Sequence, residues 1–168
     1  VPSIIDALPA GAMAAILADP TTRERHVEAI RAFASDGGYD GIDIDYEQFA
    51  FADGRDTWAT TRPNWVLFIE ELGAALHADG RTLTVSIPPV YDGDRTPESG
   101  YWVYDYGAII DHVDRIRMMT YDYSVASAGP IGPLPWVRTT VGYAISVMPS
   151  WKVQGGVPAY CRDWVTSR

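Results

Sequence analysis

Residues 40–47 read Asp-Gly-Ile-Asp-Ile-Asp-Tyr-Glu, and this octapeptide decides the fold more than any other stretch of the chain. Three carboxylates, Asp43, Asp45 and Glu47, recur at every second position, and the residues between them are β-branched or aromatic. A period of two among strand-forming residues predicts a β-strand with the acids on one face and the apolar side chains on the other. Successive acids on such a strand lie ~6.6 Å apart. We therefore expect the pKa of at least one carboxyl group to be raised by its neighbours, as in a catalytic strand.

The acidic strand has two other interpretations. The acids can form the solvated face of a half-exposed strand, or they can be oxygen ligands for Mg²⁺ or Ca²⁺. An EF-hand is excluded, because its loop needs Gly at the sixth position and Glu at the twelfth. His26 and His77 fall in helical patterns, so no histidine completes a transition-metal set. We expect no metal and no other cofactor. The alternative is a metal-dependent barrel enzyme that uses the three acids as ligands, and chelators would inhibit such an enzyme.

The composition is that of one globular domain with an excess of acids. The chain has 168 residues, of which 47% are apolar and 21% are charged. This length and apolar content are enough for one packed core. The net charge of −9 argues against nucleic acid and against anionic membranes as partners. The chain has no apolar run long enough to predict a membrane span. The single cysteine, Cys161, cannot form a disulfide within the chain.

Strand and helix patterns alternate along the whole chain. The first complete helix is expected to open with a capping box of Thr21 and Glu24, and the next begins at Pro63. The apolar residues of both helices recur with the spacing of one buried face. The predicted strands are 1–5, 39–47, 82–88, 115–121 and 152–158, and the predicted helices are 21–34, 63–78, 104–112 and 135–148.

This order predicts an α/β fold with a parallel sheet, because the connections are long enough for parallel crossovers. A doubly wound nucleotide-binding sheet needs a Gly-rich turn between a strand and its helix, and no turn here has one. In a (β/α)8 TIM barrel, functional residues follow several strands, as the polar and aromatic clusters do here. A complete barrel takes about 250 residues. We therefore predict that residues 1–168 are one partial barrel domain with about strands 3–7 present, and that more chain lies upstream.

Three segments resemble, in order and spacing, glycoside hydrolase family 18, the chitinases and their relatives. Residues 40–47 resemble the family signature, and Arg117-Met-Met-Thr-Tyr-Asp-Tyr123 resembles the family's sixth strand. Val153–Arg162 resembles the seventh strand, where Gly-Val-Pro-x-Tyr-Gly-Arg is usual. The resemblance covers essentially the whole chain. Leu17-Ala-Asp-Pro20 and Trp136 are most similar to bacterial secreted or cell-wall-associated members.

The resemblance implies roles for nine residues. Glu47 would protonate the glycosidic oxygen of the substrate and later activate water. Asp45 would orient the substrate's acetamido group, and Asp43 would share a proton with Asp45. Tyr121 would donate its hydroxyl to the acetamido group. The substrate-binding residues that the resemblance implies are Asp122, Met119, Tyr46, Tyr160 and Arg162.

Two places depart from the family pattern. Tyr46 and Gln48 stand where many chitinases have Trp and Tyr, so we expect the subsites near Glu47 to differ. Cys161 replaces the usual Gly after Tyr160. Because that Gly often adopts conformations that a side chain disfavours, we expect an altered backbone turn there.

The resemblance implies a glycosidase of the chitinase or endo-β-N-acetylglucosaminidase type, extracellular or cell-wall-associated. It would cleave β-1,4 bonds next to N-acetylglucosamine with retention, the substrate's own acetamido oxygen being the nucleophile. Its partner would be an N-acetylglucosamine-containing polysaccharide or oligosaccharide, such as chitin, peptidoglycan or the chitobiose core of N-glycans. The alternative is a non-catalytic chitin- or peptidoglycan-binding barrel. Such relatives usually lose the terminal acid, whereas Glu47 is present.

Overall fold

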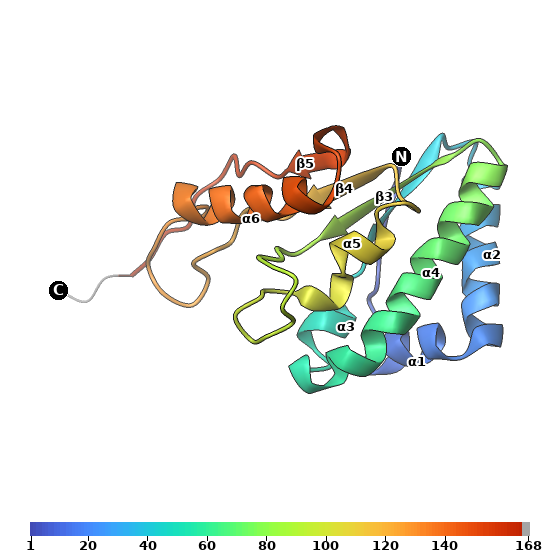
Figure 1. Cartoon of the computed structure of the whole chain (residues 1–168), viewed down its shortest axis with the longest axis horizontal. Coiled ribbons are helices and arrows are strands. Elements are labelled where there is room, and N and C mark those ends of the chain that lie inside the picture. The colour runs from blue at the N-terminus through green and yellow to red at the C-terminus, as the bar shows by residue number, and fades with distance from the viewer. Residues whose placement is uncertain (166–168) are drawn as a thin grey trace.

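Five parallel strands form one sheet in the order in which they occur along the chain. The computed structural model describes residues 1–165, and helices lie against the sheet (Figure 1). The predicted α/β class and parallel order are confirmed. Within the described residues β1 and β5 do not pair with each other, so the sheet is an open, five-stranded section of a barrel. The strands are β1 (Ser3–Ile5), β2 (Gly41–Asp45), β3 (Thr82–Ile87), β4 (Arg115–Met118) and β5 (Val153–Gly155).

Helices make the crossovers between successive strands. The two longest, α2 and α4, pack side by side, and α6 lies along the β4 and β5 end of the sheet (Figure 1). The α-helices are α1 (Ala12–Ala18), α2 (Pro20–Asp36), α3 (Gln48–Phe51), α4 (Trp58–Ala78), α5 (Tyr106–Ile109) and α6 (Leu134–Val147). Short 3₁₀ turns occupy Arg55–Thr57, Trp102–Tyr104 and Ser150–Lys152.

The two faces of the sheet differ in polarity, because side chains alternate along each strand. Ile42 and Ile44 of β2 are fully buried in the apolar cluster that also holds the inner stripes of the helices. Asp43 points to the opposite face, where the strand register aligns it with Thr84 of β3, and Thr84 with Arg115 of β4. The sheet therefore has one apolar face under helices and one polar face, which corresponds to the interior of a barrel.

The core is dominated by helix α4. Its predicted buried stripe is confirmed, because all five members are fully buried against the sheet and α2. Each such side chain contributes roughly 1.5–3 kcal/mol through removal of apolar surface from water. The stripe therefore fixes the helix layer on which β2 and its acids rest. Its members are Trp65, Phe68, Ile69, Leu72 and Leu76.

Several predicted element ends are wrong. Helix α2 begins one residue before Thr21, and its N-cap is Asp19, whose carboxylate accepts a hydrogen bond from the Thr22 N–H at 2.8 Å. Helix α4 begins at Trp58 and continues through Pro63, although proline cannot donate the helical hydrogen bond. Burial of Trp58 in the core accounts for the earlier start. The short helices α1 and α3 were not predicted, because neither has enough turns to show a period.

Strands β2, β4 and β5 are shorter than predicted. Strand β4 ends at Met118, where its pairing with both β3 and β5 ends. Strand β2 ends at Asp45, so Glu47 lies just beyond the strand and not within it. The predicted helix 104–112 is instead a 3₁₀ turn followed by the four-residue helix α5.

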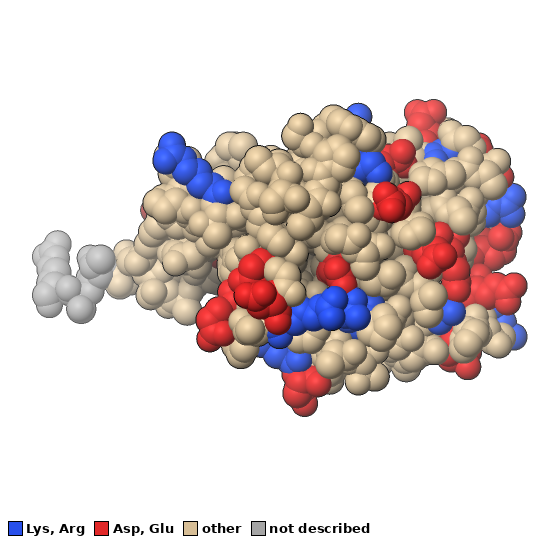
Figure 2. Space-filling view, in the orientation of Figure 1, with Lys and Arg blue, Asp and Glu red and all other residues tan. Residues whose placement is uncertain are grey.

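The charges of the surface are mixed. On the face shown in Figure 2, acidic and basic side chains lie among one another, and the area over α6 carries few of either. In the part of the chain that the structure describes, no helix has the length and hydropathy needed to cross a membrane.

Candidate active site

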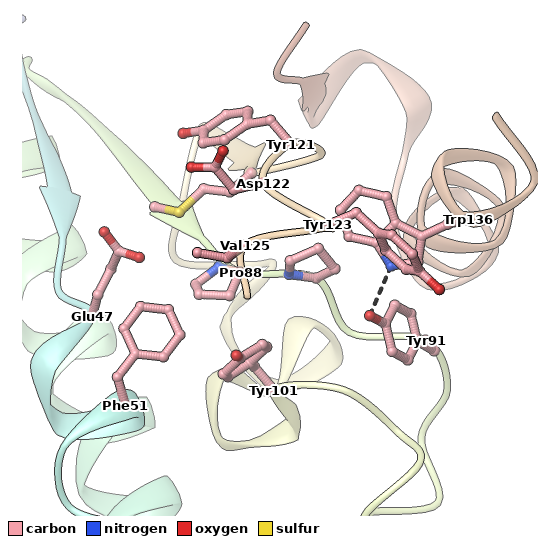
Figure 3. Close-up of a pocket in the computed structure, with 12 residues that line it drawn as sticks. Glu47, Phe51, Pro88, Tyr91, Tyr101, Tyr121, Asp122, Tyr123, Val125 and Trp136 are labelled. Atoms are coloured by element: carbon pink, nitrogen blue, oxygen red, sulfur yellow. Dashed lines mark hydrogen bonds between the residues drawn. The ribbon is translucent and has the colours of Figure 1, made fainter. Parts of the chain in front are cut away.

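A pocket of about 440 Å³ opens at the C-terminal ends of β2, β3 and β4. Figure 3 shows Glu47 and Phe51 on one side of it, and Tyr91 and Trp136 on the opposite side. This is the end of a parallel sheet at which barrel enzymes carry their active sites. The lining comes from the segment after β2 (Glu47, Phe51), the segment after β3 (Pro88, Pro89, Tyr91, Tyr101) and the segment after β4 (Met119, Tyr121, Asp122, Tyr123, Val125, Trp136).

Glu47 is the acid that the segment after β2 contributes to this pocket. It is the residue at which the chain turns from β2 into α3, with φ −117° and ψ −28°. Burial, together with the charges of Asp45 and Asp6, raises the pKa of Glu47 to about 7. The raised pKa expected from the acid spacing is therefore found, and Glu47 can hold a proton near neutral pH.

Asp45 lies behind Glu47 at the end of β2. Burial raises its pKa, and the nearby charges of Asp43 and Asp6 raise it further, whereas Arg117 acts in the opposite direction. Its Oδ1 atom is buried and has no hydrogen-bond partner among the described residues. An unsatisfied buried carboxylate oxygen is costly, so this atom lacks a hydrogen-bond donor that a buried carboxylate normally has. Asp45 is not among the residues that line the pocket.

Asp43 is fully engaged by other side chains. It is 1% exposed and accepts hydrogen bonds from Ser3 Oγ at 2.6 Å and from Ser86 Oγ at 3.0 Å. Its Oδ2 atom also pairs with Arg117 Nη1 at 2.7 Å. The predicted sharing of a proton with Asp45 stays a prediction, because Arg117 pairs with Oδ2 of Asp43 and leaves Oδ1 with Ser86 as its hydrogen-bond partner. No hydrogen bond joins the two aspartates.

Tyr121, Met119 and Asp122 converge on the pocket from the segment after β4. Met118 is fully buried in the core, and Met119 lines the pocket, so the two adjacent methionines face opposite ways. Burial and the charges of Asp45 and Glu47 raise the pKa of Tyr121, so its hydroxyl stays protonated and can donate. Figure 3 shows Tyr121 and Asp122 together on the side of the pocket opposite Phe51 and Tyr101.

Tyr160 and Arg162 act on Asp122 from the segment after β5. The Tyr160 hydroxyl donates to Asp122 Oδ1 at 2.8 Å, and Arg162 Nη2 lies 2.8 Å from the same oxygen. These contacts lower the pKa of Asp122, the Arg162 hydrogen bond having the largest effect. Asp122 itself has a left-handed backbone, with φ 56°. Cys161 is exposed and is not among the residues with a positive φ, so its side chain sits on an unstrained backbone. The altered turn expected at this position stays a prediction.

Tyr46 does not belong to the pocket, and its predicted substrate-binding role is wrong. Its side chain is 0% exposed and stacks on Phe68 of α4, with ring centroids 5.8 Å apart. Its hydroxyl lies 2.7 Å from His26 Nε2 of α2. The two-residue alternation of β2 points Tyr46 away from the acids, into the helix layer.

Aromatic side chains form much of the pocket wall, and those described next are not among the predicted site residues. Trp136 Nε1 donates to the Tyr91 hydroxyl at 2.8 Å, and Tyr123 lies against Trp136 with ring centroids 5.2 Å apart. Phe51 and Tyr101 meet edge to face on the side near Glu47. Such rings offer flat apolar surfaces with polar edges, which suit the faces of sugar rings.

Asp6 is the residue of the site that sequence reasoning missed completely. It follows β1, is 3% exposed, and accepts hydrogen bonds from the backbone N–H groups of Glu47, Gln48 and Phe49.

Within residues 1–165, no group of three or more His, Cys, Asp or Glu side chains is arranged to hold a metal ion.

A parallel sheet with paired acids and an aromatic pocket at its C-terminal strand ends defines a barrel site built for a polar, ring-shaped ligand. The family model of glycosyl hydrolases family 18 matches residues 11–168. The chain belongs to this family.

Relatives of known name share most of this chain. YdhD of Bacillus subtilis, named as a sporulation-specific glycosylase, is 34% identical over 154 residues, which are 89% of this chain and 34% of that protein. The cortical fragment-lytic enzyme of Bacillus subtilis is 26% identical, over 89% of this chain and 33% of its own length. A chitinase from Chromobacterium violaceum is 29% identical with a TM-score of 0.78, over 94% of this chain and 48% of its own. The chain thus spans between a third and a half of these relatives.

Proposed function

We propose that the intact protein is a retaining glycosidase that hydrolyses β-1,4 bonds next to N-acetylglucosamine, and that residues 1–168 are part of its catalytic barrel. The observation that carries the proposal is Glu47, an acid with a pKa of about 7 at the wall of an aromatic pocket. A raised pKa is what a general acid needs near neutral pH. Membership of family 18 supports the same chemistry.

In the first step, Glu47 donates its proton to the glycosidic oxygen as the bond to the anomeric carbon breaks. The carbonyl oxygen of the substrate's 2-acetamido group attacks that carbon and forms an oxazolinium ion, as family 18 enzymes do in place of an enzyme nucleophile. The unpartnered Oδ1 of Asp45 would accept the acetamido N–H and offset the positive charge that develops.

In the second step, the Glu47 carboxylate takes a proton from water, and the resulting hydroxyl attacks the anomeric carbon from the face that the leaving group vacated. The oxazolinium ring opens, the acetamido group is restored, and Glu47 is protonated again. Two displacements at one carbon give net retention of configuration.

The remaining residues would bind and orient the sugar. The Tyr121 hydroxyl would donate to the acetamido carbonyl oxygen, and Met119 would line the acetamido pocket. Asp122, held by Tyr160 and Arg162, would accept hydrogen bonds from the acetamido group or the sugar hydroxyls. In this scheme Asp43 fixes β2 through its contacts with Ser3, Ser86 and Arg117 and does not touch the substrate.

Parallel assays distinguish the two candidate substrate classes, since a relative named as a chitinase and one named for cortical fragments both match. The intact protein is given chitotetraose and purified peptidoglycan in parallel, and new reducing ends are measured. Release from either substrate supports the proposal and selects the glycan. Binding without any release would contradict it and favour a non-catalytic barrel. Both glycans lie outside the cytoplasm, so we place the protein extracellularly or at the cell wall.

The pH dependence of hydrolysis follows from Glu47. Since Glu47 must carry a proton to act as the acid, and its pKa is raised to about 7, the active form predominates below that value. We expect kcat/KM to fall about tenfold per pH unit on the basic side of this pKa. Initial rates on chitotetraose across the neutral range test this. A basic limb near the ordinary carboxyl pKa of 4.5 would contradict the assignment.

A further inference from the structure

We propose that Asp6 is a positioning residue for Glu47, because its buried carboxylate holds the backbone on which the acid is mounted. The expected effect of Asp6 on turnover rests on the proposed function. Its expected effect on the backbone of the turn rests on the geometry alone. Asp6 Oδ1 accepts the N–H of Glu47 at 2.8 Å and that of Gln48 at 3.0 Å, and Oδ2 accepts the N–H of Phe49 at 3.1 Å. Its side chain thus binds three consecutive amides located 41 to 43 residues further along the chain.

The turn that carries Glu47 depends on these bonds. Strand β2 ends at Asp45, and the backbone of Glu47 turns away from the extended conformation and begins α3. Glu47 makes no capping hydrogen bond with its own side chain. Because N–H groups left unpaired in a partly buried turn are costly, a carboxylate that satisfies three of them favours this turn over its alternatives.

The sheet brings Asp6 to this position. The register of β1 with β2 pairs Ile5 with Asp45, so Asp6 is the next residue beyond the paired end of β1. From there it reaches over the end of β2. In addition, the buried Tyr104 donates its hydroxyl to the Tyr46 carbonyl at 2.8 Å. The backbone of residues 46–49 is therefore held by two side chains, Asp6 and Tyr104, and the Glu47 carboxyl is left free to face the pocket (Figure 3).

The carboxylate of Asp6 also acts on Glu47 through its charge. Within residues 1–165 its hydrogen-bond partners are the three amides, and no Lys, Arg or His side chain pairs with it. Its charge therefore adds to burial and to Asp45 in raising the pKa of Glu47. The other titratable groups around Glu47 are Asp45 of β2, Tyr101 and Tyr104 before α5, and Tyr121 after β4.

Three substitutions in the intact protein separate the two effects. Asp6→Asn keeps an oxygen for two of the amides and removes the charge, whereas Asp6→Ala removes both. Asp19→Asn is the matched control, because Asp19 caps α2 in the same chemical way and does not line the pocket. Each variant is measured by amide hydrogen exchange, by carboxyl NMR titration of Glu47, and by kcat, KM and their pH profiles on chitotetraose.

We expect Asp6→Ala to speed the exchange of the Glu47, Gln48 and Phe49 amides and to lower kcat by about 10²-fold with little change in KM. We expect Asp6→Asn to lower the pKa of Glu47, which moves the basic limb of the rate profile to lower pH. Asp19→Asn should change neither property. Unchanged exchange in Asp6→Ala, or an unchanged Glu47 titration in Asp6→Asn, would overturn the inference.

The glycosidase proposal and the role of Asp6 are tested by different measurements. If the wild-type protein cleaves no N-acetylglucosamine glycan, the glycosidase proposal is wrong. Amide exchange and the Glu47 titration still decide the role of Asp6, because neither readout needs turnover. Loss of kcat in Asp6→Ala with a normal Glu47 titration and normal exchange would assign Asp6 a merely structural role.

Discussion

Replacing Glu47 with Gln is expected to abolish hydrolysis while oligosaccharide binding persists. The amide keeps the shape of the side chain but has no proton to give, and general acid–base catalysis contributes about 10²–10⁴-fold. The loss should appear in kcat, measured as reducing ends released from chitotetraose. Calorimetric titration with the same oligosaccharide should give a nearly unchanged dissociation constant, because Glu47 forms only one side of the pocket.

Glu24→Gln is the matched control for this substitution. Glu24 lies on the exposed side of α2, away from the pocket, so the same chemical change there should leave both turnover and binding unaltered. Retention of more than a tenth of the wild-type activity in Glu47→Gln would remove Glu47 from the role of acid. The next carboxyl group to consider would then be Asp45.

Removing the acetyl groups of the substrate is expected to abolish its hydrolysis, because the acetamido oxygen is the proposed nucleophile. If the substrate's acetamido oxygen attacks the anomeric carbon, an oligosaccharide without acetyl groups at the cleavage subsite should bind and not react. A thiazoline analogue of the oxazolinium ion should inhibit hydrolysis of the acetylated substrate, because it mimics the charged intermediate. The measurement compares kcat/KM for chitotetraose with that for its fully deacetylated form.

The control for this comparison is binding. Deacetylated oligosaccharide should compete with a labelled chitotetraose for the pocket of Glu47→Gln, which separates failure to react from failure to bind. Efficient cleavage of the deacetylated substrate would point to an enzyme nucleophile. Asp45 is the carboxylate of β2 whose charge raises the pKa of Glu47.

The fold could be predicted because its signals are local. The alternation of acids and apolar residues in 40–47 marks β2, and the stripe of α4 marks the helix that covers it. The ends of the elements could not be predicted, because pairing sets them. Strand β4 ends at its last residue paired with β5, Met118. Helix α4 begins before the predicted Pro63, because Trp58 is buried in the core.

The candidate site was predicted where its residues lie within the three family segments. Glu47, Met119, Tyr121 and Asp122 line one pocket, as the resemblance implied. Tyr46 was misassigned although the alternation of β2 already placed it opposite the acids.

The contacts that were missed join distant segments. Asp6 is a single acid after a short strand, and its partners lie more than 40 residues away. Arg117 was quoted within a family segment, but its pairing with Asp43 depends on the register of β2, β3 and β4. No local pattern encodes such a register, so neither contact could be read from the sequence.

The most direct test of the central claim is the configuration of the first product. The intact protein is mixed with chitotetraose, and the anomeric protons of the released sugar are followed by NMR before mutarotation. Glu47 acting twice at one carbon, with the acetamido group as nucleophile, predicts that the β-anomer appears first. Initial appearance of the α-anomer would show a single displacement by water, and would contradict the account.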